Sequence, residues 1–358
     1  MPSISIIMSV FNTESYLEKS IQSVLNQTFS DYEFIVINNG STDGSASIIS
    51  KYQNLDSRIV VIENKKNKSL ACARNQALDI AKGKYIYVID SDDYLETEAL
   101  ESIYKLADTK NVDLVVFGWV MEYYQDDKFL SYPVMPINAE YLSASSFREN
   151  AYRYLNQSIL SVPWNKLYRN EIIKKYNIRY KETKLEDHHF NMDFIMNISS
   201  AIFIDKPFYH YFRSRPESEL EFVYKFDLFT KKKEHYLHTK NVFDNWNLKN
   251  KKAWNVLYTY FAERIVQSIQ ELYGNNRLSK KEKKDKIKAI LNDPEARVAI
   301  AKAHPKGLLM HFMVLPLKTR SCSLCLAEAK FINSFKKRHP SFFVKLKSEH
   351  VNIAKEHK

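Results

Sequence analysis

Three carboxylates stand close together directly after an apolar run. Asp90, Asp92 and Asp93 follow residues 85–89, which are all aromatic or β-branched. Such a run is typical of a strand that is buried on both faces. Because an unpaired charge is costly to bury, we expect the three acids outside the core, at the carboxyl edge of a sheet, where open α/β sheets bind ligands. Oxygen ligands suit Mg²⁺ or Mn²⁺, so the pattern predicts a metal site; a solvated turn that caps the next helix is the alternative.

A second acidic pair, Glu186 and Asp187, opens a predicted helix that runs to about residue 197. Adjacent carboxylates can raise one another's pKa, and taken alone such a pair at a helix start only caps the helix. His188 and His189 follow; they can bind a metal or an acceptor, but such histidines are more often structural.

The elements that would position these acids alternate along the first part of the chain. Strands are predicted at 3–10, 32–37, 59–63 and 85–89, with helices at 14–27, 45–54 and 70–81. This alternation predicts an α/β fold with a doubly wound, mostly parallel sheet flanked by helices. Ser69 is expected to cap the helix at 70–81. The inward face of that helix would be Leu70, Ala73, Ala77 and Ile80.

The rest of the chain changes character at about residue 226. Before it we expect helices at 96–107, 143–155 and 170–176, strands at 112–119 and 201–211, and a loop or short edge hairpin at 121–141. After it, Lys-rich helical patterns cover 227–246, 251–273 and 279–291. A domain boundary is therefore predicted between Pro216 and Phe226, which gives an α/β domain at 1–220 and a basic helical C-terminal region at 221–358.

Composition limits the partners. The chain has 358 residues and a net charge of +11, which permits anionic lipid, a polyanion or nucleic acid as a partner. No nucleic-acid-binding motif is recognised beside this charge, so no nucleic acid is expected as a partner.

Cys322 and Cys325 form a lone C-x-x-C pair, which is weak evidence for zinc or redox chemistry. The cysteine usage suits a reducing compartment. No signal peptide is recognised, and the apolar stretch 307–317 is too short to span a bilayer. We therefore expect a cytoplasmic protein, or one bound peripherally to the inner face of the cytoplasmic membrane.

An ordered set of motifs resembles the family 2 inverting glycosyltransferases of the bacterial cell-surface polysaccharide type. The motifs are residues 5–12, Gln27-Thr28-Phe29, 38–44, Ala73-Arg74-Asn75, 90–93, 164–167 and Glu186-Asp187. The set covers roughly residues 1–215. The resemblance implies the GT-A fold, with a nucleotide-binding part at about 1–120 and an acceptor part at about 121–220. No family is recognised in the helical remainder.

The resemblance also implies roles for single residues. Asp92 with Asp90 would bind Mn²⁺ or Mg²⁺, and Asp187 beside Glu186 would be the catalytic base. The nucleotide would be contacted by Val10, Phe11, Asn12, Asn39, Arg74, Asp90, Ser91, Arg213 and Arg215. For Arg74, a purely structural bridge between loops is the alternative.

Two residues depart from the pattern of the family. Asn39 stands where the family has an Asp that accepts the uracil N3–H; Asn can accept the same bond, but it loses the charge and brings a donor. Lys68 stands where the family usually has Gly and adds positive charge near the expected diphosphate. A UDP-sugar is therefore the expected donor, with a cytosine nucleotide as the alternative.

These implications predict a metal-dependent inverting glycosyltransferase of the hexosyl- or N-acetylhexosaminyl-transferring class. The acceptor would be a hydroxyl of a polysaccharide or lipid-linked glycan, such as a capsule, a lipooligosaccharide or a teichoic-acid-like polymer. One alternative is a nucleotidyltransferase, whose Gly-rich basic loop is missing from residues 9–13; another is a non-catalytic nucleotide-sugar-binding protein. The basic helical region would dock at an anionic membrane surface or at the acceptor, and a homo-oligomer contact is the alternative.

Overall fold

The computed structural model describes residues 1–125, 128–155, 158–183, 185–213, 228–305 and 307–338. Contacts divide the chain into two compact units. The first comprises Met1–Arg148 and Gln157–Pro216, and the second Glu149–Asn156 and Glu217–Lys358. The short segment Glu149–Asn156 thus groups with the helical unit, although the sequence analysis assigned it to the first domain. Each unit is described by itself.

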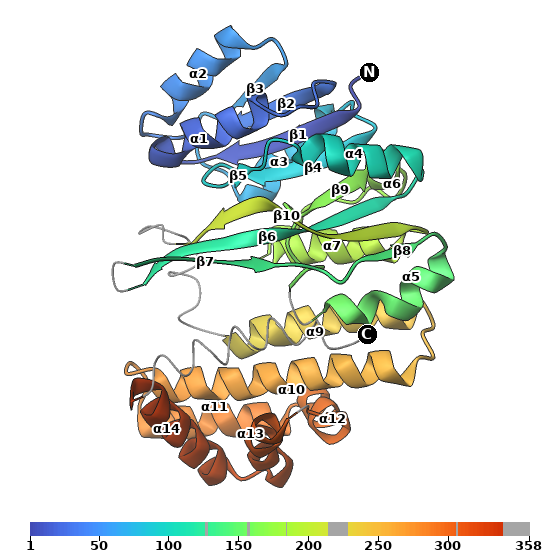
Figure 1. Cartoon of the computed structure of the whole chain (residues 1–358). Helices are drawn as coiled ribbons and strands as arrows, with labels where there is room; N and C mark the ends of the chain where they lie inside the picture. Colours follow the sequence, from blue (N-terminus) through green and yellow to red (C-terminus); the bar gives the residue numbers. More distant parts are fainter. Residues whose placement is uncertain (126–127, 156–157, 184, 214–227, 306, 339–358) are drawn as a thin grey trace. The chain divides into compact units, whose positions relative to one another are not determined.

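The first unit is built on a ten-stranded sheet with the order β3-β2-β1-β4-β9-β6-β10-β5, while β7 pairs with β6 and β8 with β10 (Figure 1). The four strands nearest the N-terminus are parallel, as predicted. They are β1 Ile4–Val10, β2 Tyr32–Asn38, β3 Ile59–Glu63 and β4 Tyr85–Asp90. Nearly all residues of β1, β2 and β4 are buried, which explains their continuous apolar runs.

Helices connect and flank these strands. They are α1 Glu14–Leu25, α2 Ser45–Leu55, α3 Leu70–Ile80 and α4 Ala99–Thr109. Ser69 caps α3, since its hydroxyl accepts a hydrogen bond from the Cys72 N–H (3.2 Å). The predicted inward face of α3 is partly wrong, because Ile80 is exposed and the buried residues are Ala71, Ala73, Arg74, Ala77 and Leu78. The helix therefore turns Arg74 toward the sheet.

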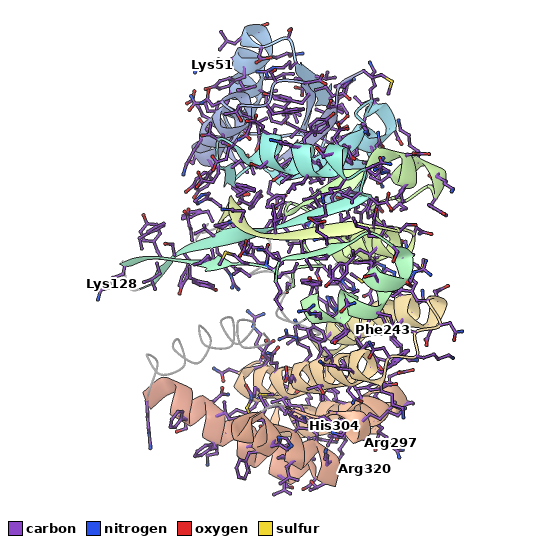
Figure 2. The ribbon with its side chains drawn as sticks, turned by 45° about the vertical axis from the view of Figure 1, so that its right-hand side comes forward. Lys51, Lys128, Phe243, Arg297, His304 and Arg320 are labelled. Carbon is purple, nitrogen blue, oxygen red and sulfur yellow. The ribbon has the colours of Figure 1, made fainter. Side chains whose placement is uncertain are left out.

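The second half of the sheet is mixed, so the sheet as a whole is less parallel than predicted. Its strands are β5 Tyr94–Leu95, β6 Leu114–Gln125, β7 Lys128–Val134, β8 Ala139–Tyr141, β9 Lys166–Arg169 and β10 Ala201–Phe212. Only β10 and β6 pair in parallel there, whereas β9 is antiparallel to both β4 and β6. The hairpin expected within 121–141 is formed by β6 and β7 and reaches beyond the rest of the sheet, with Lys128 near its tip (Figure 2).

Short helices complete this part of the chain. They are α5 Ala144–Asn150, the 3₁₀ turn Ala151–Tyr154, α6 Asn170–Lys175 and α7 Glu186–Met196. Strand β10 changes register on both sides of Pro207, since proline cannot donate a ladder hydrogen bond. Beyond this irregularity, Tyr209 and His210 pair with Leu95 and Tyr94 of β5.

The second unit is helical, and α10 is its central element, because each of the other long helices contacts it. Its helices are α9 Leu228–Asn245, α10 Lys251–Gly274, α11 Lys280–Asn292, α12 Pro294–Lys302, α13 Leu308–Thr319 and α14 Cys322–Arg338. Side chains of Asn250, Ser279 and Asp293 cap α10, α11 and α12. The apolar stretch at 307–317 forms α13. Among the described helices, none combines the length and apolar character needed to cross a bilayer.

Candidate active site

The three predicted metal-site acids lie at the end of β4, but not all in the same environment. Asp90 and Asp92 are partly exposed. Asp93, which we expected outside the core, is only 1% exposed. Its Oδ2 accepts a hydrogen bond from the Tyr209 hydroxyl (2.5 Å) and its Oδ1 accepts one from the Phe212 N–H (2.9 Å). Burial, together with the charges of Asp92 and Asp90, raises the pKa of Asp93 well above its usual value. These two bonds compensate for its burial, so Asp93 faces the protein and not a ligand.

Arg74 links the acidic turn to the second acidic pair. The guanidinium is 2% exposed, and its Nη2 donates to Asp90 Oδ1 at 2.8 Å. Its Nη1 donates to Asp187 Oδ1, and the group lies over the Tyr180 ring. A buried cation shared by two carboxylates is a favourable arrangement only when both partners are in place. Arg74 is thus a bridge between two predicted site acids.

Asp187 sits in the first turn of α7, with its side chain 33% exposed. Burial raises the pKa of Asp187 to about 7; the Arg74 charge opposes this shift, and the charges of Glu186 and Asp90 add to it. A carboxyl with such a pKa can accept a proton near neutral pH. The Asp187 carbonyl accepts a hydrogen bond from Asn191 Nδ2 (2.8 Å), which also donates to the Ser161 carbonyl (3.0 Å).

The loop before β9 supports this region and is built around Lys166. This lysine is completely buried, and burial lowers its pKa well below its usual value. Its Nζ donates to the Ile159 carbonyl (2.6 Å), to Asn165 Oδ1 (2.6 Å) and to the Val162 carbonyl. Three acceptors match the three donors of an ammonium group. The motif Trp164-Asn165-Lys166-Leu167, to which the sequence analysis gave no role, therefore fixes the shape of this loop.

The loops expected to hold the nucleotide base are joined to each other and to the acidic turn. Asn12 has φ 50°, and its Oδ1 accepts a hydrogen bond from the Thr42 N–H (2.8 Å). The Val10 carbonyl accepts one from the Asn39 N–H (2.8 Å). Thr13 Oγ1 donates to Ser91 Oγ (3.0 Å). These bonds bring Val10, Phe11, Asn12, Asn39 and Ser91 to one edge of the sheet.

The side chain of Asn39 is buried and fully hydrogen-bonded. Its Nδ2 donates to Asn67 Oδ1 (2.9 Å) and to the Lys68 carbonyl (2.8 Å). Its Oδ1 accepts from Asn64 Nδ2 (3.1 Å) and from the Lys68 N–H (3.2 Å). An aspartate would place an oxygen against the Lys68 carbonyl, where neither atom can donate. The departure at position 39 is therefore matched by a network that only an amide satisfies.

Three predicted site residues remain: Arg213, Arg215 and Glu186. Arg213 is exposed, and its N–H donates to the Glu122 carbonyl (2.8 Å); Arg215 lies outside the described residues. Glu186 is half-buried beside Asp187. Tyr209 was not predicted as a site residue, since nothing in a strand-like run indicates which hydroxyl reaches an acidic turn.

The donor set of the acidic turn fits one kind of metal binding. Within the described ranges, no cluster of three or more His, Cys, Asp or Glu side chains could hold an ion by itself. Mg²⁺ and Mn²⁺ in nucleotide enzymes are commonly bound by one or two carboxylates together with substrate phosphates. Asp92 and Asp90 fit this arrangement, so an ion would bind there with a nucleotide and not alone.

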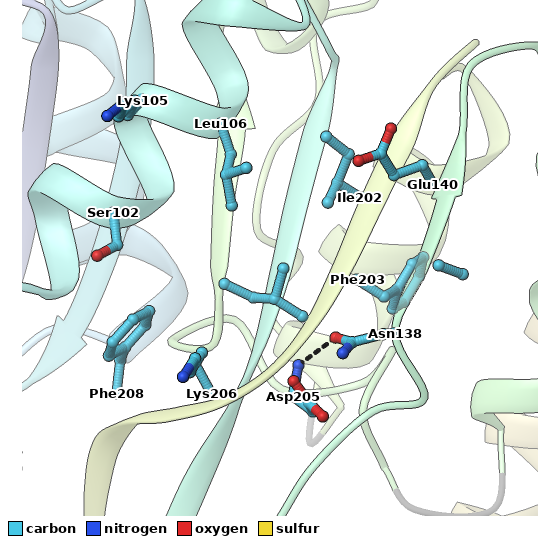
Figure 3. A pocket seen from close by; sticks show the side chains of 12 residues that line it. Ser102, Lys105, Leu106, Asn138, Glu140, Ile202, Phe203, Asp205, Lys206 and Phe208 are labelled. Carbon is cyan, nitrogen blue, oxygen red and sulfur yellow. Dashed lines mark hydrogen bonds between the residues drawn. The ribbon is translucent and has the colours of Figure 1, made fainter.

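A hollow of about 630 Å³ lies elsewhere on the first unit, between α4 and strands β8 and β10 (Figure 3). Asn138 Oδ1 accepts a hydrogen bond from the Asp205 N–H (2.6 Å) at its wall. None of the predicted site residues lines it.

Several known glycosyltransferases are similar in sequence to this chain. The sequence model described as Glycosyl transferase family 2 matches residues 5–177. The chain is 28% identical to the cholesterol galactosyltransferase of Borreliella burgdorferi, over 76% of this chain and 83% of that protein. It is 32% identical to the poly(ribitol-phosphate) β-N-acetylglucosaminyltransferase TarP of Staphylococcus aureus, over 55% of this chain and 58% of that protein. Other curated relatives are likewise matched over only 60%, 30% and 65% of their own lengths.

One solved structure shares the fold over nearly the whole chain. The crystal structure of S. aureus TarS 1–349 in complex with UDP-GlcNAc is 19% identical, with a TM-score of 0.66, over 93% of this chain and 92% of that one.

Proposed function

We propose that the chain, whose residues 5–177 match the model of glycosyl transferase family 2, is a metal-dependent inverting enzyme of that family. It would move a hexosyl or N-acetylhexosaminyl group from a UDP-sugar to a hydroxyl of a cell-surface glycan. The observation that supports this most is the pairing of Asp187 and Asp90 on Arg74. It brings the expected catalytic base beside the expected metal-binding turn, as sugar transfer requires.

The donor would lie across the carboxyl edge of the sheet. We propose that Val10, Phe11, Asn12 and Asn39 surround the base, that Ser91 and Asp90 contact the ribose side, and that Arg213 and Arg215 neutralise the diphosphate. A contact between Asn39 and the base would replace one of the four hydrogen bonds it now makes. UDP-GlcNAc is the first donor to test, because the complex of TarS contains it and TarP is named as an N-acetylglucosaminyltransferase.

Asp92 and Asp90 would hold Mn²⁺ or Mg²⁺ together with the diphosphate. When bound, such an ion supplies positive charge that stabilises the leaving nucleoside diphosphate. Arg74 keeps Asp90 Oδ1 oriented by a charged hydrogen bond.

Asp187 would remove the proton from the acceptor hydroxyl. The hydroxyl oxygen then attacks the anomeric carbon from the face opposite the diphosphate, and the configuration inverts. With a pKa of about 7, the carboxylate is both sufficiently basic and substantially ionised near neutral pH. Glu186, its neighbour, would add to that basicity through its charge.

For the acceptor we propose a polysaccharide or lipid-linked glycan, and poly(ribitol phosphate) is the first polymer to test because TarP is named for it. The net charge of +11 suits a polyanion. A sterol acceptor, as named for the Borreliella relative, is the contrasting case.

For the helical unit we propose docking at an anionic membrane surface. Phe312 and Leu315 of α13 are 68% and 54% exposed, on the side of the helix away from the buried Val314 and Leu317. Leu324 and Phe331 of α14 are exposed as well. Lys318 and Arg320 follow at the end of α13 and would add attraction to anionic lipid. Self-association through the same side chains is the competing outcome.

The deciding experiment is a donor screen. UDP-, CDP- and GDP-sugars are incubated with the protein, Mn²⁺ and either water or poly(ribitol phosphate) as acceptor, and release of the nucleoside diphosphate is measured. We expect release from a UDP-sugar that EDTA and Asp187→Asn both abolish. Binding of the nucleotide sugars without any release would support a non-catalytic binding protein instead.

A further inference from the structure

The end of strand β10 contacts the acidic turn through the hydroxyl of Tyr209. Tyr209 is completely buried. Its hydroxyl accepts a hydrogen bond from the Asp90 N–H (3.2 Å) and donates one to Asp93 Oδ2 (2.5 Å). One phenol oxygen thus joins the first and last residues of the turn that carries Asp92.

The ring that presents this hydroxyl is itself held by aromatic packing. It stacks on the Trp164 ring, with centroids 4.4 Å apart and planes 8° apart. The Trp119 ring meets Trp164 edge-on at 5.0 Å. Because stacked and edge-on pairs have defined geometry, the ring leaves the hydroxyl little freedom to move.

The main chain of β10 adds two hydrogen bonds, one on each side of Tyr209. The Phe212 N–H donates to Asp93 Oδ1 (2.9 Å), and the Phe208 carbonyl accepts from the Glu96 N–H (2.9 Å). The strand that follows the turn, β5, has only two residues, so it fixes the turn weakly by itself. Strand β10 therefore holds the turn from one side, in addition to the bonds that Thr13 makes to Ser91 and Arg74 makes to Asp90.

We infer that Tyr209 is a positioning residue for the donor site: its hydroxyl, with Asp93, holds the turn so that the Asp90 and Asp92 carboxylates face the diphosphate and its divalent cation. This inference rests on the proposed function. Groups that orient metal-binding carboxylates are worth about 10–100-fold in metal affinity or activity.

Replacing Tyr209 with phenylalanine separates this role from packing. Tyr209→Phe keeps the ring and its stack on Trp164 and removes only the hydroxyl. Tyr85→Phe is the matched control, because Tyr85 is equally buried and lies on β4. Its hydroxyl donates to the Ala107 and Val112 carbonyls (3.0 and 3.4 Å) and accepts from Arg169 Nη2 (3.3 Å), away from the acidic turn. Both variants lose a buried hydroxyl, but only one loses a contact to the turn.

The readout is Mn²⁺ binding in the presence of UDP, which is measured from the electron paramagnetic resonance signal of free Mn²⁺. A thermal melt of each variant is recorded as well. We expect Tyr209→Phe to weaken Mn²⁺ binding by about 10–100-fold, with a melting temperature like that of Tyr85→Phe and unchanged Mn²⁺ binding in the control. Binding by Tyr209→Phe within about twofold of wild type, or equal losses in both variants, would overturn the inference.

Two further measurements cover the remaining outcomes. If Tyr209→Phe does not fold, Asp93→Asn takes its place, since Tyr209 and Phe212 donate to different oxygens of Asp93 and the amide replaces one of these acceptors with a donor. If the wild-type protein with UDP binds no Mn²⁺, the metal part of the proposed function fails, and the inference is then judged on turnover of UDP-GlcNAc. A loss of tenfold or more relative to Tyr85→Phe supports it, and equal turnover overturns it.

Discussion

Asp187 and Asp90 lie on different elements of the first unit, yet each accepts a hydrogen bond from the same buried guanidinium, that of Arg74. The side chain expected to bind nucleotide therefore also connects the expected base to the expected metal-binding turn. This position makes Arg74 a determinant of the ionisation of Asp187.

The pH dependence of turnover should follow the ionisation of Asp187. Burial raises its pKa to about 7, and the base acts only as a carboxylate, so turnover should rise with pH through this region. Asp187→Asn should bind nucleotide sugar normally and lose about 10²–10⁴-fold in turnover. Initial rates at saturating donor across pH test this. Unimpaired turnover with weakened donor binding would make Asp187 a binding residue.

The stability of the fold should also depend on the ionisation of Asp187, but it should fall as pH rises, whereas turnover should increase. Its pKa is about 7 in the folded state and about 3.9 in an unfolded chain, so between these values the folded state holds the extra proton. The free energy of unfolding therefore falls as pH rises through this window. The melting temperature of the wild type, relative to that of Asp187→Asn, should decrease accordingly.

Arg74→Met should raise the pKa of Asp187 further, because the Arg74 charge now opposes the effect of burial. The acid limb of the turnover profile should move to higher pH, and the protein should become less stable because two carboxylates lose their shared cation. Arg179→Met is the control, since Arg179 forms an ion pair with Asp79 at the surface (3.2 Å). A profile for Arg74→Met that matches this control would contradict the assigned role.

Asp92→Ala should nearly abolish transfer while the melting temperature stays close to that of the wild type. The carboxylate is partly exposed at the end of a strand, so its removal leaves no cavity in the core, but it removes an expected ligand of the cation. Turnover at increasing Mn²⁺ concentration, with EDTA as the zero point, is the measurement. Full activity of the variant in EDTA would end the metal hypothesis.

Asn39→Asp should alter the preference among UDP-, CDP- and GDP-sugars, because it replaces a donor with a charge. It should also cost about 1–3 kcal/mol of stability, since the new oxygen faces the Lys68 carbonyl that Nδ2 now contacts at 2.8 Å. Donor binding by calorimetry and a denaturant titration test the two parts separately. An unchanged donor preference together with reduced stability would show that Asn39 serves the loop alone.

Removal of the exposed apolar side chains of α13 should release the protein from membranes. The double variant Phe312→Ser, Leu315→Ser should no longer float with anionic liposomes at low salt, whereas Leu55→Ser, which changes an exposed leucine of the first unit, should float like the wild type. High salt should weaken binding of the wild type and of Leu55→Ser. Wild-type protein that ignores the liposomes but self-associates through these residues would favour the oligomer contact.

Long periodic elements were predictable from the sequence. Strands β1 to β4 and helices α1 to α3 lie within two or three residues of their predicted bounds, because their apolar spacing is regular over a full element. Strands β5 and β9, with two and four residues, are too short to show a period. Ile80 was placed inward, but small alanines together with Arg74 form the buried face of α3.

The residues of the expected site could be named from the sequence, but the bonds that connect them could not. The acids at 90, 92 and 187 can be recognised from type and position. The burial of Asp93 could not, since its partners Tyr209 and Phe212 lie 116 and 119 residues further along the chain. The joint pairing of Arg74 also depends on tertiary packing, so the sequence could not show that two carboxylates meet at one guanidinium.

The ammonium group of Lys166 has a consequence for engineering. It holds a loop by three main-chain and side-chain oxygens, and that loop carries Trp164, on which Tyr209 stacks. A mutant library that randomises the acceptor side of the enzyme and includes position 166 would discard most clones through a misshapen loop, whatever their new specificity. Directed evolution toward other sugars should therefore hold Lys166 constant and vary the residues at the strand ends.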